Sequence, residues 1–111
     1  MIQEDTKMSE RTPVDVSFVP HKGGYRAEPP SHVAHPFAKN AVTFRNFTGS
    51  PVDVFFPGGF LTGGPPRIDV NAEATWTIAD VPAGVYPYAA YVVNAKQFVE
   101  GNSAPEIIID K

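Results

Sequence analysis

The chain has 111 residues, of which 42% are hydrophobic and 19% are charged, and its formal net charge is −3. This length is typical of one domain with its own core, and the slight negative charge disfavours nucleic acid and acidic membrane surfaces as partners. The absence of cysteine excludes disulfides, thiolate metal ligands and cysteine nucleophiles. No run reaches the ~20 apolar residues of a membrane span and the first residues form no export signal, so we expect a soluble, cytoplasmic protein.

Two parts of the chain differ in composition. Residues 1–12 are polar and of mixed charge, and we expect a flexible tail there, followed by one domain at residues 13–111. Within the domain, apolar and polar residues alternate with the period of two that indicates half-buried strands. The runs that predict strands are 14–19, 41–47, 52–56, 68–71, 73–78, 84–93 and 107–109.

Proline and glycine clusters separate these runs, and no window shows a helical period over ten residues. Residues 25–39 hold three prolines, so we expect irregular chain there with at most a short extended piece near 31–35. About seven or eight short strands with turns between them indicate an all-β sandwich or barrel. The run at 84–93 is apolar on both faces, which is typical of a strand in the middle of a packed sheet.

Three segments resemble the cupredoxin family, the class of plastocyanin and azurin. Residues 44–54 are similar to the family's strand, Asn, Gly/Pro loop and following strand, and residues 84–90 are similar to its G-x-Y-x-[FY]-x-C strand. Residues 107–109 resemble its last strand. The resemblance covers roughly residues 14–111, and it implies a Greek-key β-sandwich.

The copper ligands of that family are not found at the matching positions. The resemblance places the first ligand His at Val52 and the ligand Cys at Ala90, or at Val92 if the strand is shifted by two. It places the second His and the axial Met in the loop 94–104, which contains neither residue type. A blue-copper site needs two His and a Cys thiolate. We therefore expect the fold without its electron-transfer function, and no cofactor.

Two other kinds of chemistry remain as alternatives. His21, His32 and His35 lie in one N-terminal region and are candidate metal ligands, although residues three apart on an extended segment point to opposite faces. Solvated loop histidines are the simpler interpretation. A small hydrolase-type enzyme is the weaker alternative, because neither a nucleophile elbow nor a phosphate loop is present.

Loops at one end of the sandwich supply a candidate interaction surface. Its residues are Phe60, Leu61, Tyr91, Phe98 and Asn102. The alternative for Phe60 and Phe98 is that they close the core from above. The sequence thus predicts a non-catalytic binding or structural module, with an unidentified protein or a second copy of the chain as its partner.

Overall fold

The structure is a computed structural model that describes residues 14–100 and 104–111. The predicted tail of residues 1–12 lies outside the described residues. Within them, the chain forms twelve short strands and one 3-10 turn, η1 (Pro57–Gly59). In chain order, the strands are β1 (Val16–His21), β2 (Gly24–Glu28), β3 (Ser31–Ala34), β4 (Ala41–Asn46), β5 (Val52–Phe55), β6 (Leu61–Thr62), β7 (Arg67–Ile68), β8 (Glu73–Ile78), β9 (Gly84–Pro87), β10 (Ala89–Val92), β11 (Gln97–Phe98) and β12 (Glu106–Ile109). None of the described residues belongs to a helix long and apolar enough to cross a membrane.

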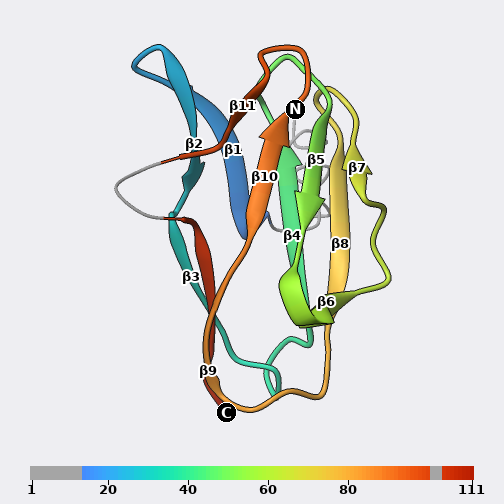
Figure 1. Cartoon of the computed structure of the whole chain (residues 1–111). Coiled ribbons are helices and arrows are strands. Elements are labelled where there is room, and N and C mark those ends of the chain that lie inside the picture. The colour runs from blue at the N-terminus through green and yellow to red at the C-terminus, as the bar shows by residue number, and fades with distance from the viewer. Residues whose placement is uncertain (1–13, 101–103) are drawn as a thin grey trace, which may run out of the picture.

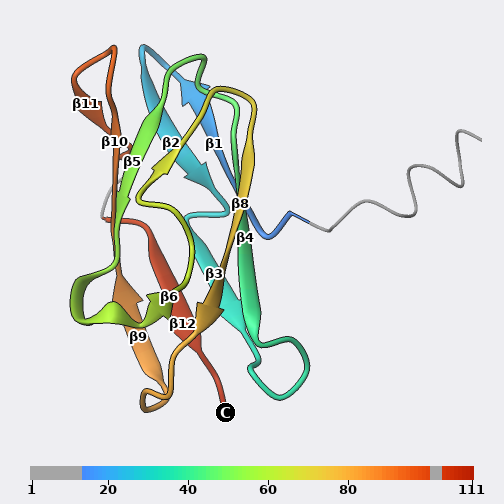
Figure 2. The same ribbon diagram turned by 90° about the vertical axis from the view of Figure 1, so that its right-hand side faces the viewer.

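The strands form two layers that face each other, as Figures 1 and 2 show. The first layer is a five-stranded sheet in the order β2-β1-β4-β8-β6. The second layer holds the ladders β11-β10-β5-β7 and β3-β12-β9, which are joined because β9 continues into β10 with only Tyr88 between them. The pairs β1–β4 and β3–β12 are parallel, and the other ladder pairs are antiparallel. The predicted all-β sandwich is confirmed.

The chain between residues 25 and 39 is more regular than the sequence pattern predicts. β3 matches the short extended piece expected near 31–35, but the prediction of irregular chain is wrong for β2. β2 pairs with β1 in the first layer, whereas β3 pairs with β12 in the second. Pro29 and Pro30 lie between the two strands, where the chain passes from one layer to the other. Because they lie outside the strands, their missing N–H groups cost neither ladder a hydrogen bond.

One predicted strand is shorter than expected. The alternation at 68–71 predicts four strand residues, but β7 ends at Ile68. Asn71 has a φ of +61°, a left-handed conformation that an extended strand does not contain. The turn lets Asn71 N–H donate to the carbonyl oxygen of Asn46, at 3.0 Å. The alternating pattern cannot show such a turn, because it depends on a contact with a distant residue.

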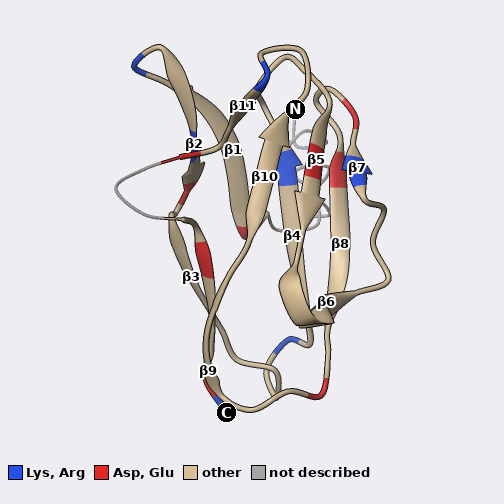
Figure 3. Cartoon of the chain, viewed as in Figure 1, with Lys and Arg blue, Asp and Glu red and all other residues tan. Residues whose placement is uncertain are grey.

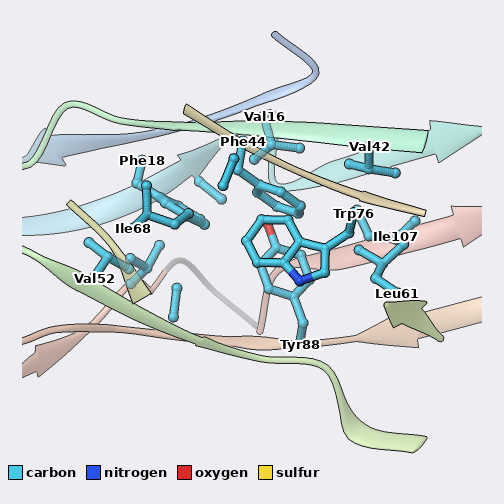
Figure 4. Close-up of a cluster of buried hydrophobic side chains, with 14 of the residues drawn as sticks. Val16, Phe18, Val42, Phe44, Val52, Leu61, Ile68, Trp76, Tyr88 and Ile107 are labelled. Carbon is cyan, nitrogen blue, oxygen red and sulfur yellow. The ribbon is translucent and has the colours of Figure 1, made fainter. Parts of the chain in front are cut away.

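An aromatic cluster fills the space between the layers (Figure 4). The Phe44 ring lies 5.6 Å from the ring of Phe18 and 5.3 Å from that of Trp76. The rings of Phe56 and Tyr88 each lie 5.6 Å from Phe44 as well. Several of these pairs are edge-on or tilted, the arrangements that aromatic quadrupoles favour. Phe44 therefore lies at the centre of the cluster that holds the two layers together.

Trp76 is the one tryptophan of the chain, and it is buried on β8. The backbone of Gly64 approaches its indole ring so closely that a Cβ at this position would overlap Cε2 and Cδ2 of the ring. Only glycine therefore fits where the loop between β6 and β7 passes over the tryptophan.

Replacing Phe44 by alanine should remove the centre of the aromatic cluster. We expect Phe44→Ala to lower the free energy of unfolding by about 3–5 kcal/mol, since a buried aromatic side chain is lost and a cavity is left. Urea denaturation measures the loss. Phe37→Ala is the matched control, because Phe37 is 89% exposed and its loss should change the free energy by less than about 0.5 kcal/mol. Equal effects of the two substitutions would contradict this account of the core.

Candidate functional site

The positions that the cupredoxin resemblance assigns to copper ligands lie on two neighbouring strands, β5 and β10. In their antiparallel register Val52 is opposite Val92, and Ala90 is opposite Val54. Val52, Ala90 and Val92 are completely buried and point into the core. Within the described residues, no group of three or more His, Cys, Asp or Glu side chains is placed to hold a metal ion. Packed hydrocarbon thus fills this part of the sandwich.

The segment after β10 folds back over the same end of the sandwich. Phe98 lies on β11, directly opposite Tyr91 on β10. Val99 is buried, and its N–H donates to the carbonyl oxygen of Ala90 at 2.7 Å. Asn102, a residue of the predicted interaction surface, lies outside the described residues. The returning chain is therefore held to β10 at Ala90 by a backbone hydrogen bond, and it places the buried Val99 in the core.

A buried amide, that of Asn46, holds the loop between β4 and β5. Its Nδ2 donates to the carbonyl oxygens of Ser50 (2.7 Å), Ile68 (3.1 Å) and Asp69 (3.2 Å). Its Oδ1 accepts from the backbone N–H (2.9 Å) and the Oγ1 (2.7 Å) of Thr48. Both ends of the amide are satisfied, as a fully buried polar side chain requires.

Ser50 extends this network to the chain that follows β10. Its Oγ accepts from the backbone N–H of Asn94 at 2.9 Å and donates to the carbonyl oxygen of Pro51 at 2.9 Å. The N–H of Val93 also donates to Pro51, at 3.0 Å. Hydrogen bonds therefore tie the β4–β5 loop to the loop after β10. The alternating pattern does not reveal this network, although Asn followed by Thr and Ser is a recognisable signal of side-chain capped turns.

The three candidate histidines lie in different places. His21 ends β1 at the tip of the β1–β2 hairpin, whereas His32 is on β3 and His35 follows it, well away from that tip (Figures 1 and 2). His32 Nε2 lies 4.0 Å from Asp15 Oδ1, and His35 Nδ1 lies 3.6 Å from Asp110 Oδ2. Each of these two histidines thus faces a different carboxylate, and the structure does not bring the three together.

His32 lies in a partly buried polar cluster. Asp15 also accepts from Lys39 Nζ at 3.0 Å and from the backbone N–H of Thr43 at 2.8 Å. Burial lowers the pKa of His32 below its ordinary value of 6.5, and the charges of Lys39 and His35 lower it further. The negative charge of Asp15 acts in the opposite direction but does not reverse the shift.

Two residues of the predicted interaction surface are buried. Phe60 is 1% exposed and Leu61 is 4% exposed, so the prediction that these side chains face a partner is wrong. The Phe60 ring lies 5.6 Å from that of Phe56 and 4.9 Å from that of Tyr86. The turn η1 directs the chain back to the sandwich, and the alternative in which Phe60 closes the core is correct.

Tyr91 and Phe98 belong to a larger apolar surface on the outside of the second layer. Their rings are 5.0 Å apart and edge-on, and Phe98 is 55% exposed. Next to them Phe55 lies opposite Ala89, and farther along the layer Val33, Ile108 and Val85 form one cross-strand row. We call this surface the outer face; its residues are Val33, Phe55, Val85, Pro87, Ala89, Tyr91, Phe98 and Ile108.

Comparison with known proteins identifies the fold. No protein-family model matches the sequence, and no curated protein matches it. Among solved structures, the Cu(I) forms of two methionine-to-alanine mutants of amicyanin match with a TM-score of 0.57 and 17% identity, over 92% of this chain and 88% of that chain. A reduced tryptophan-to-tyrosine mutant of amicyanin matches over the same shares with a TM-score of 0.56 and 18% identity. The chain has a cupredoxin-like fold without the copper ligands.

Removing the Asn46 amide should destabilise the fold. We expect Asn46→Ala to lower the free energy of unfolding by about 3 kcal/mol or more, because several buried carbonyl oxygens and the Thr48 N–H lose their partner. Urea denaturation again provides the measurement. Asn40→Ala is the control, because Asn40 is exposed and uses its backbone carbonyl to accept from Ile78 N–H. A free energy of unfolding that is unchanged in Asn46→Ala would show that the network does not hold the loop.

The lowered pKa of His32 predicts a pH dependence of stability. Since the pKa is lower in the folded chain than in the unfolded one, protonation favours unfolding. The contribution of neutral His32 is complete above the unfolded pKa and is lost as the pH falls through the folded pKa. We expect the urea midpoint to fall between about pH 7.5 and about pH 5.5, and to fall less in His32→Gln.

His21→Gln is the matched control for this prediction. It removes a histidine from the distant hairpin, so the fall in the midpoint should equal that of the parent. If His32→Gln retained the full fall, the partly buried imidazole would not be its source.

Proposed function

We propose that the protein is a non-catalytic binding module on a cupredoxin-like fold, and that the outer face is its contact surface. The observation that carries this proposal is the exposure of the apolar side chains there. Phe55 is 65% exposed, Val85 is 58% exposed and Val33 is 46% exposed. Contiguous apolar surface of this kind marks interaction sites in soluble proteins.

The outer surface of the first layer has the opposite character, which supports a specific role for the outer face. On β4 and β8, Thr43 and Thr75 lie opposite each other and share a hydrogen bond of 2.8 Å. Next to them, Arg45 pairs with Glu73 at 3.1 Å. The outward side chains of β4 and β8 are therefore polar and paired with one another, although Thr43 is only 1% exposed. Exposed apolar side chains are more numerous on the outer face, which has few charged residues.

The composition of the matching site supports binding rather than electron transfer. The family's blue-copper centre requires a thiolate, and this chain has no cysteine. A hollow of about 340 Å³ beside Ala89 and Phe98 has Glu100 and Tyr88 as its titratable lining residues. Burial raises the pKa of the Tyr88 hydroxyl, so this group stays protonated at neutral pH and is a poor general base.

Site-specific photo-crosslinking in the cell that makes the protein tests the contact surface. A photoreactive phenylalanine analogue is placed at position 55, at position 85 and, as a control, at position 77. Thr77 is exposed on β8 in the polar layer. We expect covalent adducts from positions 55 and 85 but not from 77.

The contrast between positions decides this test, whatever the partner is. Adducts that formed equally at 55, 85 and 77 would indicate random encounters and overturn the proposal. The same holds for the absence of adducts at 55 and 85. The mass of each adduct shows whether the crosslinked partner is a second copy of the chain or another protein.

A further inference from the structure

We infer that the occupant of the outer face is a second copy of this chain, in a symmetric dimer whose outer faces pack against each other. This inference rests on the proposed function and names its partner. It begins from the central segment, 84–92, which contains no charged residue. Its inward side chains Tyr88, Ala90 and Val92 are buried in the core.

The outward side chains of the same segment are also apolar or aromatic. They are Val85, Pro87, Ala89 and Tyr91. Strands that are apolar on both faces belong to sheets that are covered on both sides. The first layer covers the inner face here, but no described residue covers Val85 or Phe55. The second layer therefore has two apolar faces, as a sheet packed between two others does. A sheet of the second copy would cover its outer face.

The size of the outer face suits a protein surface rather than a small ligand. A fully exposed aromatic side chain presents about 150–250 Å², and Phe55 and Phe98 keep more than half of theirs exposed. With the other six residues, the outer face offers on the order of 500 Å² of apolar surface, at the upper end for monomeric proteins. A stable interface needs about 800 Å² per partner, so polar residues around the patch would have to contribute the remaining area.

Charge favours a second copy over an unrelated partner. In a two-fold symmetric interface each patch meets itself, so any unpaired charge would meet a like charge. Asp53 lies opposite Tyr91 on the same side of the layer, and it pairs with Arg67 at 2.6 and 3.1 Å, so these two charges neutralise each other. Glu106 lies between Ser31 and Pro87 on this side and accepts from Ser31 Oγ at 2.8 Å, so it keeps its negative charge within the surface.

Figure 3 shows that the strands β9 and β10 in front are free of charge along their length. The neighbouring strands contribute Asp53, Arg67 and Glu106 to this side, so the described outer face carries one uncompensated negative charge, that of Glu106. A symmetric contact through the outer face brings few like charges together.

The sheet edges are poor alternatives for self-association. β2 is followed by Pro29 and Pro30, and β7 is preceded by Pro65 and Pro66, which have no N–H donor. β6, β7 and β11 have only two residues each. The remaining longer edges, β3 and β9, have four residues each. Edge-to-edge pairing would therefore form few hydrogen bonds. Face-to-face packing of two sheets, about 10 Å apart, uses the outer face instead.

Analytical ultracentrifugation of the purified chain tests the inference. We expect the parent to sediment with twice the monomer mass of 12.0 kDa, and to dissociate on dilution. Phe55→Glu should sediment as a 12.0 kDa monomer at the same concentrations, because it buries a charge against its own symmetry mate. Thr77→Glu adds the same charge to the polar layer and should remain a dimer.

A second variant and a stability control keep the result clear. Val85→Glu changes the same face from another strand and should also give the monomer. Urea midpoints measured on dilute protein show whether each variant is folded, and exposed positions such as 55 and 85 should tolerate the change. A parent that stays monomeric up to about 1 mM would overturn the inference, since even a Kd of that order would be visible. Folded Phe55→Glu and Val85→Glu variants that dimerise like the parent would do the same.

The outcome also separates this inference from the proposed function. If positions 55 and 85 crosslink to another protein while the purified chain stays monomeric, the outer face is a contact surface and the dimer is wrong. If neither position crosslinks to any protein and the chain is monomeric, both proposals fail.

Discussion

The hydrogen bonds of the Asn46 side-chain amide hold together one end of the sandwich, where the β4–β5 loop meets the chain after β10. The amide connects the end of β4, the turn before β5 and the end of β7, and the Ser50 hydroxyl carries the connection to the chain after β10. Those contacts fix the strands that carry Val52 and Ala90. In the resemblance, these two positions belong to metal ligands; here hydrogen bonds organise the loops, and hydrocarbon fills the space between them.

Much of the fold follows from local pattern, because a period of two and the turn residues are visible in any short window. β4, β5, β8 and β12 lie where the alternation predicts them, give or take a residue or two. The pattern does not reveal β2, since prolines that end a strand look the same as prolines within irregular chain. It also overextends β7, because the left-handed Asn71 depends on a hydrogen bond to the distant Asn46.

The candidate site was less predictable, and the reasons are physical. Partners of Asn46 lie 22 and 23 residues along the chain, and no window of sequence brings them together. Glycines around Phe60 indicate a loop, yet a large ring in a loop gains more by folding back onto Phe56 and Tyr86 than by facing water. The apolar character of 84–93 on both faces is correct as a pattern, but residues 14–100 and 104–111 cover only one of the faces. That mismatch between sequence and monomer is what points to the outer face.

The close approach of Gly64 to Trp76 gives the protein a built-in reporter. The single indole packs against the rings of Phe44 and Phe56 and against the backbone of Gly64. Its fluorescence therefore comes from one buried, apolar environment. Its fluorescence maximum should move to longer wavelength only when water enters the interior. Because the ring lies between the layers and not on the outer face, this optical signal distinguishes melting of the interior from separation of two intact molecules.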